Sequence, residues 1–178
     1  EMASRNYKNA IEDWTYFQDA DDQRRLKCKQ AGLPEFYISI SHSGNKIAAA
    51  ISLRPIGIDL ETYNKQRDFV AIANHVFSVS EAAYLKNCKL EDLKPTFYLY
   101  WTLKESIAKQ HGEGLKFEVS RTQSPIQVSD TEYAAMQSWQ CSDFVLSVAC
   151  NDASEIVVDG ICIDALRRRW KNIPSNSR

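Results

Sequence analysis

Hydrophobic and polar positions alternate between residues 36 and 61, and this alternation predicts β-strands. Strands are expected over residues 36–40, 46–53 and 56–61. In the third strand the apolar residues occupy one face. Asp59 and Glu61 therefore share the opposite face, because strand side chains point alternately to the two sides of a sheet.

Two helices are predicted in the middle of the chain. Ser78 and Glu81 have the spacing of a capping box, which opens a helix that continues through Lys86. A longer helix is expected over residues 96–110, after Pro95 and before two glycines. Strand patterns return over residues 117–119, 126–128, 144–150 and 155–163, and a polar tail follows.

One order of elements occurs twice in the chain. Residues 36–61 run strand, short turn, strand and then Gly-Ile-Asp, and residues 144–164 repeat this order. The repetition predicts an α+β fold of two similar α+β halves related by a pseudo-twofold axis, each a small antiparallel sheet packed by a helix. We expect a single domain over residues 1–178, with an N-terminal half of about residues 1–62 and a C-terminal half of about residues 63–178.

The composition limits the partners and the location of the protein. The chain has 178 residues, of which 44% are hydrophobic, and a formal charge of −1, so no bulk charge attracts nucleic acid or a membrane surface. Its apolar runs are too short to span a bilayer and no signal peptide is recognisable, so a cytoplasmic protein is expected. The five cysteines form no C-x-x-C pair and are expected to be reduced thiols rather than zinc ligands.

Two charged patterns suggest chemistry, although each has an ordinary structural alternative. Asp59 and Glu61 supply the oxygen ligands that Mg²⁺ prefers, or they are the charges of a solvated strand face. On the longer helix, Trp101, Glu105 and Lys109 recur every four residues along one stripe. The alternative there is an exposed Glu–Lys pair beside a core tryptophan.

Two further segments could meet an anion. Residues 41–45 are expected to form a tight turn, which would present hydroxyl, imidazole and backbone N–H groups to a phosphate or would be an ordinary hairpin turn. A small basic cluster precedes the first predicted strand, and its alternative is a solvated loop. It consists of Arg24, Arg25, Lys27 and Lys29.

Four motifs occur together in one order. They are Ser41-His42-Ser43, Gly57-Ile58-Asp59-Leu60-Glu61, Phe77-Ser78-Val79-Ser80-Glu81 and the helical segment from Trp101 to Lys109. In order and approximate spacing they resemble the 4'-phosphopantetheinyl transferase superfamily, in its form with two fused halves. The resemblance covers residues 35–116, is fainter over residues 140–163, and implies the fold of that superfamily.

The resemblance also implies a set of binding residues. Coenzyme A, as co-substrate, would bind in a cleft between the halves. Mg²⁺ would be held by Asp59 and Glu105, with Glu61 as a third ligand or as a holder of a water ligand. The side chains implied to contact the phosphates of coenzyme A are Ser41, His42, Lys104 and Lys109.

The implied reaction transfers the 4'-phosphopantetheine group of coenzyme A to a serine of an apo acyl or peptidyl carrier protein and releases adenosine 3',5'-bisphosphate. Glu81 and Glu105 are both candidates for the base that takes the serine proton, directly or through water. Two halves in one chain would make a monomer sufficient. Fused family members have a longer segment before the Ser-His-Ser turn, which binds the 3'-phosphate of coenzyme A. Here the local substitutes are Arg24, Arg25, Lys27 and Lys29.

Two other functions are considered. A non-catalytic module that binds carrier proteins could have the same fold, although such a module need not keep Asp59, Glu105 and Lys109. An unrelated Mg²⁺-dependent phosphoryl-transfer protein lacks support, because the chain has neither a G-x-x-x-x-G-K-[ST] motif nor a G-x-G-x-x-G motif.

Overall fold

The computed structural model describes residues 10–63, 66–112, 123–128, 135–150 and 166–174. Its elements follow in the order η1 (Ile11–Asp13), β1 (Trp14–Gln18), β2 (Arg24–Cys28), β3 (Phe36–Ser43), β4 (Lys46–Ser52), β5 (Ile56–Thr62), α2 (Phe69–Val76), α3 (Val79–Asn87), α4 (Leu90–Gln110), β6 (Gln123–Val128), β7 (Met136–Gln140), β8 (Phe144–Cys150) and β9 (Leu166–Pro174).

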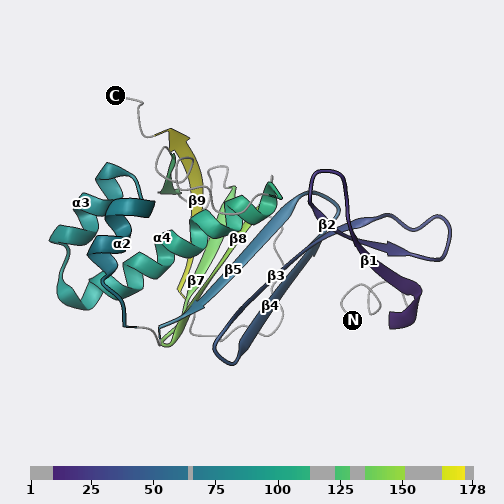
Figure 1. Cartoon of the computed structure of the whole chain (residues 1–178), viewed down its shortest axis with the longest axis horizontal. Coiled ribbons are helices and arrows are strands. Elements are labelled where there is room, and N and C mark those ends of the chain that lie inside the picture. The colour runs from purple at the N-terminus through teal and green to yellow at the C-terminus, as the bar shows by residue number, and fades with distance from the viewer. Residues whose placement is uncertain (1–9, 64–65, 113–122, 129–134, 151–165, 175–178) are drawn as a thin grey trace.

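The strands form two antiparallel sheets (Figure 1). The first has the order β1-β2-β3-β4, and the second has the order β5-β8-β7-β9-β6. The predicted α+β class with antiparallel sheets is therefore confirmed. The α-helices in the described residues all lie beside the second sheet, where α4 packs across β5 and β8.

The hairpin of β3 and β4 differs from the prediction at its tip. The turn expected over residues 41–45 is wrong, because β3 continues to Ser43, which pairs with Lys46. Only Gly44 and Asn45 remain in the turn, and Gly44 adopts a φ of +60°, which glycine tolerates without strain. The serines that looked like turn residues belong to the strand because their hydroxyls bond to β5.

Strand β5 is the link between the two sheets. It precedes the helices in the chain, yet it pairs with β8 over its whole length, from Ile56 to Thr62. Helix α4 lies directly on it at Gly57, where a Cβ atom would overlap the backbone oxygen of Ser106 and lie 2.5 Å from the nitrogen of Gln110. The absence of a side chain at residue 57 therefore sets how closely α4 approaches β5.

The helices agree with the prediction in type and differ in extent. Helix α3 begins with the predicted capping box, in which Ser78 Oγ accepts from the N–H of Glu81, and Glu81 accepts from the N–H of Ser78. Helix α4 begins at Leu90 rather than at residue 96. Pro95 lies inside this helix, where it removes one intrahelical hydrogen bond without ending the helix. Helix α2 was not predicted.

Three predicted features of the C-terminal third have different outcomes. The strand over residues 144–150 is confirmed as β8. Two strands were not predicted: β7, and β9, which residues 166–174 form in the segment expected only to be polar. The strands expected over residues 117–119 and 155–163 lie outside the described residues.

Two hydrophobic clusters hold the described elements together. One lies between the helices and the second sheet and contains Phe77, Phe97 and Leu103. The other lies on the opposite face of β5 and β8, where Ile58, Leu60 and neighbouring side chains pack toward β3 and β4. Strand β5 is thus covered on both faces, which explains why its residues are almost all buried.

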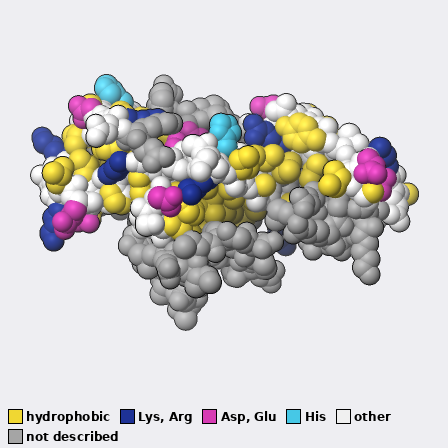
Figure 2. Space-filling model, turned by 90° about the horizontal axis from the view of Figure 1, so that it is seen from below, with side chains coloured by type: hydrophobic (Ala, Val, Ile, Leu, Met, Phe, Trp, Pro, Cys, Tyr) yellow, Lys and Arg dark blue, Asp and Glu magenta, His cyan; other side chains and the backbone are white. Residues whose placement is uncertain are grey.

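None of the helices in the described part of the chain combines the length and the apolar character that crossing a membrane requires. Among the described side chains on the face drawn in Figure 2, basic and acidic groups are scattered around a band of hydrophobic side chains. The structure describes four cysteines, and they form no disulfide with one another: Cys28, Cys88, Cys141 and Cys150. Cys162 lies outside the described residues.

Candidate functional site

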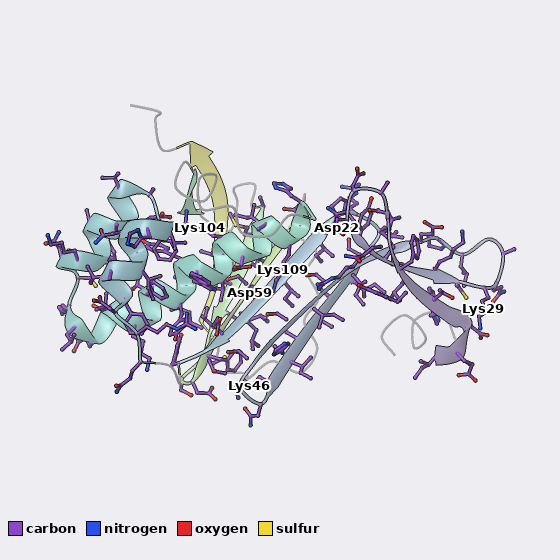
Figure 3. All side chains as sticks on the ribbon, in the orientation of Figure 1. Asp22, Lys29, Lys46, Asp59, Lys104 and Lys109 are labelled. Atoms are coloured by element: carbon purple, nitrogen blue, oxygen red, sulfur yellow. The ribbon has the colours of Figure 1, made fainter. Side chains whose placement is uncertain are left out.

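A buried aspartate and a lysine meet where α4 crosses β5 (Figure 3). Lys109 Nζ donates to Asp59 Oδ1 at 2.7 Å and to the backbone oxygen of Ile58 at 3.2 Å. Ser41 Oγ, from β3, donates to the same Asp59 oxygen at 2.8 Å. Three elements, β3, β5 and α4, therefore contribute to one polar contact.

The second oxygen of Asp59 is in a different situation. Asp59 Oδ2 is buried and has no hydrogen-bond partner among the described residues. Burial raises the pKa of Asp59, and this effect outweighs the opposite effects of Lys109 and Ser41. A buried carboxylate oxygen with no protein partner among the described residues is costly, so this atom is suited to bind a ligand.

Two glutamates lie near this aspartate. Burial raises the pKa of Glu105, and the negative charges of Asp59 and Glu61 raise it further, while Lys109 lowers it. Glu61 Oε2 accepts from Ser43 Oγ at 2.7 Å. The mutual repulsion shows that these carboxylates share one electrostatic environment, which a cation would relieve.

Within the ranges that the structure describes, no group of three His, Cys, Asp or Glu side chains is already arranged to hold a metal ion. Carboxylate oxygens are nevertheless the ligands that Mg²⁺ prefers, and Asp59 Oδ2 is directed at no other partner. Asp59, Glu61 and Glu105 are the carboxylates near this point that could hold a hard cation, and Ser41 and Ser43 already bond to the first two.

Two other predicted site residues form a separate ion pair. Lys104 Nζ lies 3.1 Å from Glu81 Oε2, and the two side chains are 4% and 5% exposed. Burial lowers the pKa of Lys104, and Glu81 counteracts this. Glu81 also closes the capping box of α3, and its other oxygen, Oε1, is buried with no hydrogen-bond partner in the part of the chain that the structure describes. The pair ties α3 to α4 and keeps two charges inside the protein.

The Ser-His-Ser motif is divided between the two faces of β3. Ser41 and Ser43 are buried toward β5, whereas His42 is exposed on the other face. The hydroxyl of Ser41 already accepts from the N–H of Leu60 and donates to Asp59. The motif therefore does not present its three side chains together, as the expected turn would have done.

The basic cluster is also divided by a strand. Arg24, Arg25 and Lys27 belong to β2 rather than to a loop, so Arg24 points to the opposite face from the other two. Arg25 lies 3.2 Å from Asp19 and stacks on the ring of Tyr37. Lys27 lies 2.9 Å from Glu35 and lowers the pKa of that carboxyl. One phosphate cannot contact all three side chains at once.

Trp101, the remaining member of the helical motif, packs in the core. Its ring stacks on Phe97, with a centroid distance of 6.0 Å and an interplanar angle of 21°. It is partly buried against the cluster between the helices and the second sheet. This contact favours the packing role over a direct part in binding.

Several contacts that shape the site were not predicted. Ser39 was not singled out, and the bonds of Ser41 and Ser43 to β5 were not expected, although the spacing of two residues along a strand was the available signal. Thr102 and Ser147 join α4 to β8 through a hydroxyl contact of 2.8 Å. Gln23 Nε2 donates to the backbone oxygen of Gln110 and so fastens the end of α4 to the first sheet. No local sequence pattern indicates these last contacts.

The sequence matches the family model described as the 4'-phosphopantetheinyl transferase superfamily over residues 55–149. A 4'-phosphopantetheinyl transferase from Bacillus subtilis is 39% identical over 83 residues, which are 47% of this chain and 36% of the relative. The 4'-phosphopantetheinyl transferase AcpT from Salmonella typhimurium is 32% identical over 120 residues, which are 67% of this chain and 58% of the relative. HetI from Nostoc, also a 4'-phosphopantetheinyl transferase, is 32% identical over 117 residues, which are 63% of this chain and 48% of the relative.

The matched segments include β5, α3 and α4, which carry Asp59, Glu81 and Glu105. In these comparisons the chain spans between 36% and 58% of the length of its relatives.

Proposed function

The chain belongs to the 4'-phosphopantetheinyl transferase superfamily, and we propose that it transfers the 4'-phosphopantetheine group of coenzyme A to a serine of an apo carrier protein. The observation that carries this proposal is the buried contact of Asp59 with Lys109, next to Glu105 and with Asp59 Oδ2 unpartnered. A charged site that is incomplete without a ligand, on the elements that match the family, fits an anionic substrate and a cation.

The proposed cation is Mg²⁺, and the residues fit it by chemistry. Asp59 and Glu105 would hold it, and Glu61 would be a third ligand or would hold a water ligand. When bound, Mg²⁺ would neutralise charge on the pyrophosphate of coenzyme A and orient it for in-line attack.

The reaction that we propose forms a bond between the serine oxygen of the carrier and the β-phosphorus of coenzyme A. The bond from that phosphorus to the leaving oxygen breaks, and adenosine 3',5'-bisphosphate is released. Lys109 Nζ would donate to a phosphate oxygen through a charge-assisted hydrogen bond. The serine proton would go to a carboxylate, for which Glu105 and Glu81 are both candidates, directly or through water.

Glu105 suits the role of the base better in one respect. Its raised pKa makes it a stronger base than an ordinary glutamate, whereas Glu81 is engaged by Lys104 and by the N–H of Ser78. Lys104 is already paired with Glu81, and a phosphate contact would use another proton of its ammonium group.

Mass spectrometry of a panel of apo carrier proteins tests the proposal. Each carrier is incubated with the protein, coenzyme A and Mg²⁺, and the expected result is a mass gain of one phosphopantetheine on at least one carrier. Matched reactions without Mg²⁺ and with Glu105→Gln should show no gain. A carrier that binds the protein but is never modified would instead favour a non-catalytic carrier-binding module.

A further inference from the structure

The edge of β5 that faces away from β8 is covered by hydroxyl groups instead of by another strand. In the described sheets β5 has β8 on one side only. Every second N–H group of β5 points away from β8, as in any β-strand. Three of these groups donate to serine Oγ atoms of β3. The N–H of Ile58 donates to Ser39, that of Leu60 to Ser41 and that of Thr62 to Ser43, with N···Oγ distances of 3.0, 3.2 and 3.1 Å.

These three serines have the same backbone role and differ in where their own protons go. A hydroxyl that accepts from an N–H has one proton left to donate. Ser41 donates it to Asp59 Oδ1 at 2.8 Å, and Ser43 donates to Glu61 Oε2 at 2.7 Å. Ser39, the first of the three serines, accepts from the N–H of Ile58, and none of its hydrogen bonds in the described residues goes to a carboxylate.

The proton of Ser41 decides which oxygen of Asp59 remains available. Ser41 and Lys109 both bind Oδ1, and Oδ2 stays buried without a partner. Because Ser41 is itself held by the N–H of Leu60, it fixes the rotation of the carboxylate against the backbone of β5. A second contact of this kind holds Glu61 through Ser43, which also meets Thr62 Oγ1 at 3.1 Å.

We propose that Ser41, and Ser43 beside it, are positioning residues that orient the Asp59 and Glu61 carboxylates for a divalent cation, and thereby couple cation binding to the junction between the two sheets. This inference rests on the proposed Mg²⁺ site. Groups that hydrogen-bond to metal ligands typically change metal affinity by about 10–100-fold when they are removed. The side chains concerned touch no substrate in this role, so they act through the carboxylates.

The three serines supply their own control. Ser39→Ala and Ser41→Ala each leave one buried N–H of β5 without its acceptor, so both should lower the melting temperature by a similar amount. Only Ser41→Ala also releases a carboxylate. Ser41→Thr keeps a hydroxyl at this position and serves as the conservative variant.

The test is a calorimetric titration of Mg²⁺ into the full chain, with and without coenzyme A, together with thermal melts. We expect Ser41→Ala to bind Mg²⁺ about 10–100-fold more weakly than wild type. Ser39→Ala should keep wild-type affinity despite its lower melting temperature, and Ser41→Thr should recover most of the affinity. If the Ser41→Ala chain does not fold, Ser43→Ala carries the same test through Glu61.

Two results would overturn the inference, and they are distinguishable. If wild type binds Mg²⁺ and the Ser41 and Ser43 variants bind it equally well, the positioning role is wrong while the proposed site survives. Equal losses in the Ser39 and Ser41 variants would lead to the same conclusion, because the effect would then be structural. If wild type binds no Mg²⁺ even with coenzyme A, the proposed site fails and the positioning role fails with it.

Discussion

Lys109 Nζ lies 2.7 Å from Asp59 Oδ1, although 50 residues separate them along the chain. The lysine is 27% exposed and the aspartate only 8%, so the contact brings a partly solvated cation to a buried anion. The ammonium offsets part of the cost of burying the carboxylate, and without it the carboxylate would have only Ser41. The ion pair should therefore stabilise the metal-free protein.

Lys109→Met should destabilise the protein at neutral pH by about 1.5–3 kcal/mol, because it removes a charged hydrogen bond from a buried carboxylate. Asp59→Asn should relieve much of this loss in the double variant, since an amide tolerates burial without a cation. A double-mutant cycle from denaturant unfolding measures the coupling. Lys89→Met, at a 79% exposed lysine with a 3.8 Å surface contact, is the control and should change stability by less than about 0.5 kcal/mol. Additive single effects would show that the pair contributes nothing.

Glu105→Gln should stabilise the metal-free protein at pH 7. Burial and the charges of Asp59 and Glu61 raise the pKa of Glu105, so the folded state holds its proton more tightly than the unfolded state. Stability from this group is full below the unfolded pKa and is lost as the pH rises through the raised folded pKa. The advantage of the glutamine variant should therefore be largest at neutral pH and should vanish in acid. Thermal melts across this pH range provide the measurement.

Mg²⁺ gives the same variant a second readout. A cation that binds only the folded state raises the melting temperature of wild type, and Glu105→Gln should gain less because it has lost a proposed ligand. The difference between the melting temperatures of Glu105→Gln and wild type should therefore shrink or change sign as Mg²⁺ is added. A constant difference at all Mg²⁺ concentrations would argue that Glu105 is not a ligand.

Gly57→Ala should destabilise the protein by about 1–3 kcal/mol or more, since the new Cβ would overlap the backbone of α4. Transfer should fall as well, because α4 carries Glu105 and Lys109 and would have to move from β5. Gly32→Ala is a useful contrast: Gly32 has a φ of +88° and no atom within 4 Å of an added Cβ, so only backbone strain of about 1–2 kcal/mol is expected there. Transfer by Gly32→Ala, measured well below its melting temperature, should stay normal.

Local patterns predicted the parts of the fold that depend on neighbouring residues. The alternation over residues 36–61 identified three strands, and the Ser78–Glu81 spacing identified the start of α3. Pairing between distant segments was not readable in this way. Nothing near β5 in the sequence indicates that it pairs with β8. Strand β2 was missed because three of its five residues are basic, so its sequence lacks the hydrophobic alternation typical of a strand.

The candidate site was predictable only to the level of residue types. The motifs indicated Asp59, Glu105 and Lys109, and the structure brings Asp59 and Lys109 into contact. They did not indicate that Ser41 is occupied by β5 and Asp59, because this depends on where β3 meets β5. Nor did they show that Lys104 is held by Glu81, since the pairing depends on how α3 packs on α4.

Breaking the Glu81–Lys104 pair should cost more than breaking a surface pair. Both groups are almost completely buried, and removing one partner of such a pair typically costs about 3–5 kcal/mol. Glu81→Gln keeps the side-chain oxygen that the capping box needs, so its loss reports mainly the lost charge. If Glu81 has only a structural role, the Glu81→Gln protein should transfer phosphopantetheine at a near-normal rate well below its melting temperature. A rate loss of about a hundredfold or more in a folded Glu81→Gln protein would instead identify it as the base.

The basic residues of β2 are the candidates for binding the 3'-phosphate of coenzyme A. Lys27 is 62% exposed and shares a face with Arg25, whereas Arg24 lies on the opposite face. A charge-assisted hydrogen bond is worth roughly 1.5–3 kcal/mol, so Lys27→Gln should weaken coenzyme A binding by about tenfold to a hundredfold if this face holds the phosphate. Dephospho-coenzyme A, which lacks that phosphate, should be affected much less, and Arg24→Gln should leave both ligands unchanged. Calorimetry with the two ligands decides the matter. A selective loss in Arg24→Gln would place the phosphate on the other face, and equal losses for both ligands would mean that β2 does not bind it.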